Sequence, residues 1–302
     1  MIKCFAWLLP FALLLGACAK KEDVILIGEY GSLSGVTATF GQSTHNGILF
    51  AVEQANSAGG LLGKQIKLIT EDDQSKPEDA RNAVLKLLQR DKVVAVLGEV
   101  SSSRSLAAAP ECQRAQIPMI SPASTNPKVT EVGDYIFRVC FIDPFQGEVM
   151  AKFAYQDLGL RKVAVLTDIK NDYSVGLTEF FVSTFTALGG EIVKHESYSE
   201  GDVDFRSQLT AIKAQNPGGI FVPGYYTEAG LIARQTRELG FAGPLLGGDG
   251  WDSEKTLEIG GKAVEGAFFS NHYAADMVEP RVQDFIAQFQ KRFNKIPDAM
   301  AL

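Results

Sequence analysis

Short, wholly apolar segments alternate with amphipathic helical segments along this chain of 302 residues. Residues 24–27, 93–97 and 163–166 carry no polar side chain, which is typical of parallel strands covered by helices on both faces. Residues 77–91, by contrast, open with Pro77 and place their apolar side chains at helical spacing. This alternation predicts an α/β protein built from doubly wound, Rossmann-like lobes.

The chain is long enough for two lobes of ordinary size joined by a hinge. We expect residues 24–141 with 273–302 to form the first lobe, and residues 142–272 the second. A connector is predicted at residues 141–145, because Pro144 interrupts a helix and restricts Asp143 to extended geometry. A second crossing between the lobes is expected near His272. Leu302 falls one turn into a further predicted helix, which suggests that the sequence is truncated at its C-terminus.

Residues 1–17 have the pattern of an export signal peptide. Lys3 precedes an apolar run at 5–15 that is too short to span a membrane. Residues 15–18, LGAC, resemble the bacterial lipobox, in which cleavage exposes a cysteine that is then lipidated. We therefore expect Cys18 to be acylated, residues 18–23 to form a lipidated tether, and the exported protein to be anchored at a membrane surface, on its periplasmic or cell-surface side. The alternative is an ordinary cleavage site with a chance cysteine.

Charge and cysteine content restrict the possible partners. The chain has 36 acidic and 29 basic residues, and its basic residues are not clustered, so nucleic acid is not expected as a partner. Cys112 and Cys140 remain once the signal and the lipidation site are set aside. These two cysteines could pair in an oxidising compartment, but separate buried thiols are the preferred interpretation.

The sequence offers few residues for catalysis. His45, His195 and His272 have no other histidine or cysteine at metal-ligand spacing, and we expect them to be surface or helix histidines. The chain contains no dinucleotide-binding glycine fingerprint and no phosphate loop. Residues 98–101 lack the last glycine of a hydrolase nucleophile elbow. We therefore expect no enzyme activity, no cofactor and no metal site.

Two loops of small hydroxylated residues follow neighbouring predicted strands, at residues 98–103 and 121–125. The carboxyl ends of strands in an open α/β sheet are where ligands bind. The first loop also leads into a helix whose free N–H groups favour an anion, so a carboxylate is the expected guest. The alternative is that Ser101, Ser102 and Ser103 only cap the helix.

Loops of the second predicted lobe carry aromatic side chains and a carboxylate. They include Tyr173, Tyr225, Trp251 and Asp249, the last of these within a run of glycines that lets the backbone approach a ligand closely. A cleft between two lobes is a usual place for a small-molecule site. The alternative is that Tyr225 is a core aromatic and Asp249 a turn residue.

Several motifs, taken in their order and spacing, resemble one family. They are GSLSG at 31–35, NSAGGLLG at 56–63, DPFQG at 143–147 and GGDGWD at 247–252. With them, the chain from residue 24 to residue 302 resembles the substrate-binding proteins of branched-chain amino-acid ABC transporters. The resemblance implies the type I periplasmic-binding fold, an amino-acid ligand enclosed between the lobes, a membrane permease as partner, and a monomer. A third crossing between the lobes, which the family has, would then lie beyond Leu302.

The resemblance also implies roles for particular residues. Ser102 and Thr125 would hold the ligand α-carboxylate. The backbone carbonyl of Ala123 and the side chain of Asp249 would hold its ammonium group, although the best-known members of the family have glutamate in place of Asp249. The cleft would be lined by the aromatic residues Phe40, Tyr173 and Tyr225.

Arg104 follows the serine loop, where a small residue is common in the family. It could bind an acidic ligand group or lie in solvent, and we expect it to lie in solvent. Other ligands also fit the pattern: a short amide, urea, or a quaternary amine held by an aromatic cage. A ligand-sensing signalling module is a further alternative.

Overall fold

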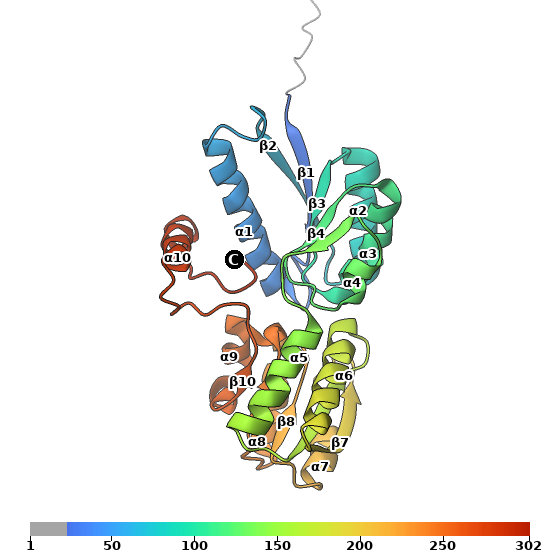
Figure 1. Ribbon diagram of the computed structural model, residues 1–302, viewed down its shortest axis with the longest axis vertical. Coiled ribbons are helices and arrows are strands. Elements are labelled where there is room, and N and C mark those ends of the chain that lie inside the picture. Colours follow the sequence, from blue (N-terminus) through green and yellow to red (C-terminus); the bar gives the residue numbers. More distant parts are fainter. Residues whose placement is uncertain (1–22) are drawn as a thin grey trace, which may run out of the picture.

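The computed structural model describes residues 23–302, so the predicted signal peptide and Cys18 lie outside the described part of the chain. It consists of two α/β lobes, one above the other in Figure 1, and each is built on a parallel sheet of five strands. The predicted fold class is therefore confirmed. Within residues 23–302, no helix combines the length and the hydropathy that a membrane span requires.

The sheet of the first lobe has the strand order β2-β1-β3-β4-β5. Its strands are β1 (Ile25–Gly31), β2 (Ile66–Asp72), β3 (Ala95–Leu97), β4 (Met119–Ser121) and β5 (Ile136–Arg138). Its helices are α1 (Ala38–Ser57), α2 (Pro77–Lys86), α3 (Ser102–Ala115) and α4 (Lys128–Glu131). The order reverses at β1, with β2 on one side and β3 on the other, which is the topological switch point where such sheets bind ligands.

The sheet of the second lobe has the corresponding order β10-β9-β8-β6-β7. Its strands are β6 (Lys162–Asp168), β7 (Glu191–Tyr198), β8 (Gly219–Phe221), β9 (Leu245–Gly247) and β10 (Phe268–Phe269). Its helices are α5 (Asp143–Lys152), α6 (Asp172–Ala187), α7 (Arg206–Lys213), α8 (Tyr226–Glu238) and α9 (Glu254–Gly260). Strand β6 is buried along most of its length, as its unbroken apolar sequence predicts.

Helix α10 (Pro280–Phe293) returns to the first lobe and lies beside α1 in Figure 1. The side chains of Phe285, Phe289 and Phe293 pack edge-on around Phe50 of α1, with ring centroids about 6 Å apart. Arg292 donates two hydrogen bonds of 2.8 Å to the carboxylate of Glu53 beside this cluster. The chain therefore crosses between the lobes twice among the described residues, once after β5 and once before α10.

The first crossing differs from the sequence prediction in one respect. Residues 141–145 were expected to form a connector with Asp143 extended, but α5 already begins at Asp143 and Ile142 is the last extended residue. Pro144 is tolerated there because the first turn of a helix has no intrahelical partner for its N–H group. The prediction for Asp143 was wrong because a proline can start a helix as well as interrupt one.

The two lobes touch directly across the cleft between them. Asp172 of the second lobe accepts a hydrogen bond of 2.8 Å from Ser103 Oγ, and its backbone carbonyl accepts one of 2.8 Å from Asn126 Nδ2. The guanidinium of Arg104 lies 3.3 Å from Glu200 Oε1 across the same gap. These contacts define the described structure as a closed arrangement of the lobes.

Candidate ligand-binding site

The loop after β3 is shaped by Gly98 and leads directly into α3. Gly98 has a φ of +121°, and a β-carbon there would collide with the carbonyl oxygen of Tyr30, so this turn requires glycine. Ser101 is the N-cap residue of α3, yet its side chain makes no capping hydrogen bond. Instead, Ser102 Oγ accepts a hydrogen bond of 3.2 Å from the backbone of Asn126. The interpretation that these serines only cap the helix is therefore not supported.

The loop after β4 is fixed against its neighbours by Arg138. The guanidinium of Arg138 donates hydrogen bonds to the backbone carbonyls of Ser124, at 2.6 Å, and Asn126, at 2.8 Å. From the other side, Ser124 Oγ lies 2.7 Å from Ser105 Oγ of α3. Ala123 and Thr125, which flank Ser124, are buried. Arg138 therefore fixes the backbone on which both of these predicted residues lie.

Aromatic rings from both lobes meet opposite these loops. Tyr173, at the start of α6, stacks on Tyr225 with ring centroids 5.4 Å apart and an interplanar angle of 5°. Phe40 of α1 packs edge-on against Tyr225 at 5.6 Å. Burial raises the pKa of Tyr225 well above its ordinary value, so its hydroxyl stays protonated at neutral pH.

Asp249 follows β9 in a tight turn made possible by Gly248. A β-carbon on Gly248 would collide with the hydroxyl of Tyr173. The Asp249 carboxylate is buried, and its Oδ2 lies 3.0 Å from Nε2 of His272. Its Oδ1 is buried without a hydrogen-bond partner among the described residues. Burial, with the charge of Asp249 nearby, raises the pKa of Tyr173 well above its ordinary value, so Tyr173 remains neutral beside this carboxylate.

All seven predicted ligand-binding residues line one cavity between the lobes. They are Phe40, Ser102, Ala123, Thr125, Tyr173, Tyr225 and Asp249. Val100, Gly250 and Met300 complete the lining and were not predicted. The cavity measures about 10 Å³, roughly the space that one water molecule needs. Ligand pockets are far larger, roughly 300–1,000 Å³, so a ligand can enter only if the lobes move apart or the lining side chains shift.

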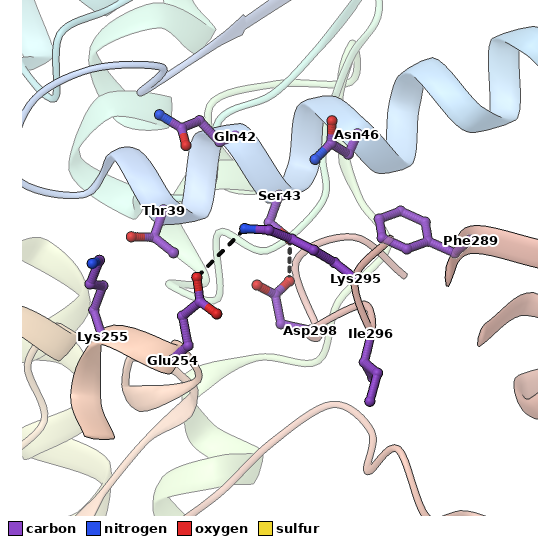
Figure 2. A pocket seen from close by; sticks show the side chains of 10 residues that line it. All are labelled: Thr39, Gln42, Ser43, Asn46, Glu254, Lys255, Phe289, Lys295, Ile296 and Asp298. Atoms are coloured by element: carbon purple, nitrogen blue, oxygen red, sulfur yellow. Dashed lines mark hydrogen bonds and ion pairs between the residues drawn. The ribbon is translucent and has the colours of Figure 1, made fainter. Parts of the chain in front are cut away.

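A larger pocket of about 450 Å³ lies between α1, α9 and the segment after α10. Figure 2 shows its lining, in which Lys295 lies 3.6 Å from Glu254 and Ser43 donates a hydrogen bond to Asp298. Burial raises the pKa of Asp298 to about 6. None of the predicted site residues lines this pocket. Because its carboxylates are already bonded to neighbouring side chains, we regard the smaller cavity as the candidate site.

Two expectations about charged side chains were wrong. Arg104 does not lie in solvent: it is 2 % exposed and lies between Glu99, at 3.8 Å, and Glu200, at 3.3 Å. His272 was expected at the surface or on a helix, but it is a largely buried residue of a crossover segment, bonded to Asp249. His195, by contrast, is an exposed residue of strand β7, as expected of a surface histidine, and its Nε2 lies 2.9 Å from Thr167 Oγ1.

The structure also describes the two remaining cysteines and the side chains that could bind a metal ion. Cys112 and Cys140 are free thiols, as preferred from the sequence. Burial raises the pKa of each thiol to about 12, so neither is reactive at neutral pH. In the part of the chain that the structure describes, no group of three or more histidine, cysteine or acidic side chains is arranged to hold a metal ion.

Comparison with known proteins shows the family of the chain. The family model described as "Periplasmic binding protein" matches residues 24–302. The chain belongs to this periplasmic binding protein family. An amino acid binding protein of Pseudomonas aeruginosa is 34% identical over 249 residues, which cover 82% of this chain and 66% of the relative. This periplasmic binding protein thus spans about two thirds of the length of that curated relative.

Solved structures show the same fold. A leucine binding protein LivK from Thermotoga maritima has a TM-score of 0.88 and 42% identity, covering 92% of this chain and 79% of its own. LivJ from Streptococcus pneumoniae, in complex with isoleucine, has a TM-score of 0.87 and 33% identity, covering 92% and 80%. The two lobes of this periplasmic binding protein therefore have the type I periplasmic-binding fold, as the sequence motifs predicted.

Proposed function

We propose that the protein is an extracytoplasmic receptor that binds an aliphatic amino acid between its lobes and delivers it to an ABC permease. The observation that carries the proposal is the opposite polarity of the two sides of the cavity. Ser102, the first residue of α3, and Thr125, in the loop after β4, line the cavity from the first lobe, and the N-terminus of α3 favours a carboxylate. Asp249 lies on the second lobe with one carboxylate oxygen that has no partner among the described residues, which favours an ammonium group.

The lining also supports an aliphatic side chain on the ligand. Asp249 is the only charged side chain among the described residues that line the cavity. The remaining walls are aromatic or apolar, with Tyr173, Tyr225, Phe40 and Met300 among them. A charged ligand side chain would be desolvated there without a partner, which is costly. Relatives described as an amino acid binding protein and as LivJ with isoleucine support the same class of ligand.

Capture would depend on movement of the lobes. Each lobe carries one half of the proposed site, so the full set of contacts forms only when the lobes close. A ligand shifts the balance between open and closed forms only through contacts that it makes better in the closed form. Closure around the amino acid would then be the feature that the permease recognises.

Export and anchoring belong to the same proposal. Residues 15–18 support acylation of Cys18, and acyl chains would hold the receptor at the membrane surface close to the permease. We expect Cys18→Ser to release the protein from the membrane fraction of cells that express it. A variant that stays in the membrane pellet as firmly as the parent would show that the anchor lies elsewhere.

We call the proposed contact between Asp249 and the ligand ammonium group the ammonium clamp. The substitution Asp249→Asn tests it. Loss of this charge in a closed, dry cleft should weaken leucine binding by ~2–5 kcal/mol, the range for breaking a buried charge pair. The parent should also bind 4-methylpentanoate, which has the same shape without the ammonium group, much more weakly than leucine. Calorimetry with both ligands measures these effects. Asp276→Asn, the same change at an exposed position, is the control and should bind leucine like the parent.

One observation favours a second candidate ligand, a quaternary amine. The parallel stack of Tyr173 and Tyr225, with Phe40 edge-on, provides aromatic faces next to a carboxylate, which is the composition of a cationic cage. In that case Tyr225→Ala should abolish binding of the best ligand while Asp249→Asn binds it within about threefold of the parent. This pair of results would favour a quaternary amine over an amino acid as the ligand.

A further inference from the structure

His272 connects the two segments that cross between the lobes. It lies between β10 and α10, and its imidazole stacks on Phe141, which lies in the other crossing, between β5 and α5. The ring centroids are 4.0 Å apart and the interplanar angle is 15°. The backbone N–H of His272 donates a hydrogen bond of 2.8 Å to the side chain of Asn271. The imidazole is therefore held in one plane at the hinge.

From this position His272 contacts one oxygen of Asp249. Its Nε2 lies 3.0 Å from Asp249 Oδ2, and the two side chains are 15% and 4% exposed. Asp249 Oδ1 has no partner among the described residues, and Asp249 lines the cavity. The contact therefore divides the carboxylate into one oxygen that is already bonded and one that is free for a ligand.

The orientation of a carboxylate needs such a contact. The terminal torsion of aspartate is broad, so the short side chain alone does not fix which oxygen is available. The backbone N–H of Asp249 makes only a long contact of 3.4 Å with Gln146. An imidazole N–H that donates from Nε2 holds Oδ2 in place and leaves Oδ1 available to accept a hydrogen bond from a ligand.

We infer that His272 is a positioning residue, whose Nε2–H donates to Asp249 Oδ2 and so aims Oδ1 at the ammonium group of the ligand. The inference rests on the proposed function, because it gives His272 a role only through the ammonium clamp. It also explains how aspartate, whose side chain is shorter than glutamate, can hold the ammonium group: a residue of the hinge fixes the orientation of its carboxylate. His272 itself need not touch the ligand.

Two substitutions separate the hydrogen bond from the stacking. His272→Phe keeps a ring that can stack on Phe141 and removes the donor. His272→Gln keeps an N–H donor close to the position of Nε2 and removes the ring. We expect His272→Phe to bind leucine about tenfold more weakly, the equivalent of one charge-assisted hydrogen bond. His272→Gln should restore binding to within about threefold of the parent.

Selectivity distinguishes positioning from a general loss of structure. Because 4-methylpentanoate has no ammonium group, His272→Phe should not weaken its binding, and the preference for leucine should fall by the same factor of about ten. His195→Phe is the matched control: it removes another histidine hydrogen bond, to Thr167 on the sheet of the second lobe, and should leave both affinities unchanged. Thermal melts of all variants confirm that each protein is folded.

The outcomes separate this inference from the proposed function. If Asp249→Asn loses leucine while folded His272→Phe binds it as tightly as the parent, the role of His272 is wrong and the ammonium clamp stands. If the parent binds no aliphatic amino acid, the proposed function fails. Nitrogen NMR of the His272 ring then decides the contact itself: we expect the Nε2–H tautomer and a change at Nε2 in Asp249→Asn. A ring that carries its proton only on Nδ1 would overturn the inference.

Discussion

His45 and Glu29 form a half-buried pair that links stability to pH. Nδ1 of His45 lies 2.8 Å from Glu29 Oε2, which also accepts a hydrogen bond of 2.8 Å from Thr70. The hydrogen bond to Glu29 raises the pKa of His45 above its ordinary value of 6.5. The folded protein therefore holds this proton more tightly than the unfolded chain does.

The sign of the effect follows from this raised pKa. The added stability is fully present below pH 6.5 and is lost as the pH rises from there through the higher pKa of the folded state. We expect His45→Gln to lower the urea midpoint most at acidic pH, with the difference from the parent shrinking above neutrality. A difference that stays constant between about pH 5.5 and 9 would contradict the assignment.

At the scale of single residues, the sequence predicted most of the lining of the cavity but not the residues that support it. The loops of Ser102, Thr125 and Asp249 could be found because each follows a predicted strand, and strand ends converge at one edge of a sheet. The family resemblance then indicated these particular residues. The positions of Arg104 and His272 could not be found in this way. Their partners, Glu200 and Asp249, lie elsewhere in the sequence, and no local sequence pattern predicts which side chains will pair in this way.

Among the elements, α10 depends on a small aromatic cluster that it shares with α1. Phe289 is 2% exposed and packs against Phe50. We expect Phe289→Ala to lower the free energy of unfolding by about 3 kcal/mol, as truncation of a packed aromatic does. Denaturant unfolding measures this change. Leu257→Ala on α9, where the leucine is 66% exposed, should change stability by less than about 0.5 kcal/mol.

The elements themselves follow from local patterns where burial is uniform. The apolar runs overlap strands β1, β3 and β6, because the part of a strand that helices cover on both faces is mostly apolar. The boundary at α5 was harder to predict. Pro144 is compatible both with an extended connector and with a first helical turn, and contacts with the rest of the lobe decide between them. The sequence alone therefore locates elements better than it locates their ends.

For the whole molecule, the closed arrangement should depend on contacts at the rim of the cleft. Glu200 of the second lobe pairs with the buried guanidinium of Arg104. We expect Glu200→Gln to shift the ligand-free protein toward open forms, since the rim pair strengthens only when the lobes meet. Small-angle scattering should show a larger radius of gyration for the ligand-free variant and the same radius for both proteins with ligand. Equal radii without ligand would show that this pair does not control closure.

The contacts of Ser103, Asn126 and Arg104 with the second lobe involve residues that do not line the cavity. They therefore set how often the ligand-free protein is closed without distinguishing one ligand from another. Apparent affinity scales with the population of the competent form, so a change at the rim multiplies every dissociation constant by one common factor. The ratio of the dissociation constants for two ligands then depends on the residues that line the cavity. Substitutions at the rim can thus adjust a binding protein of this design to scarce or abundant ligands, while the choice of ligand stays the same.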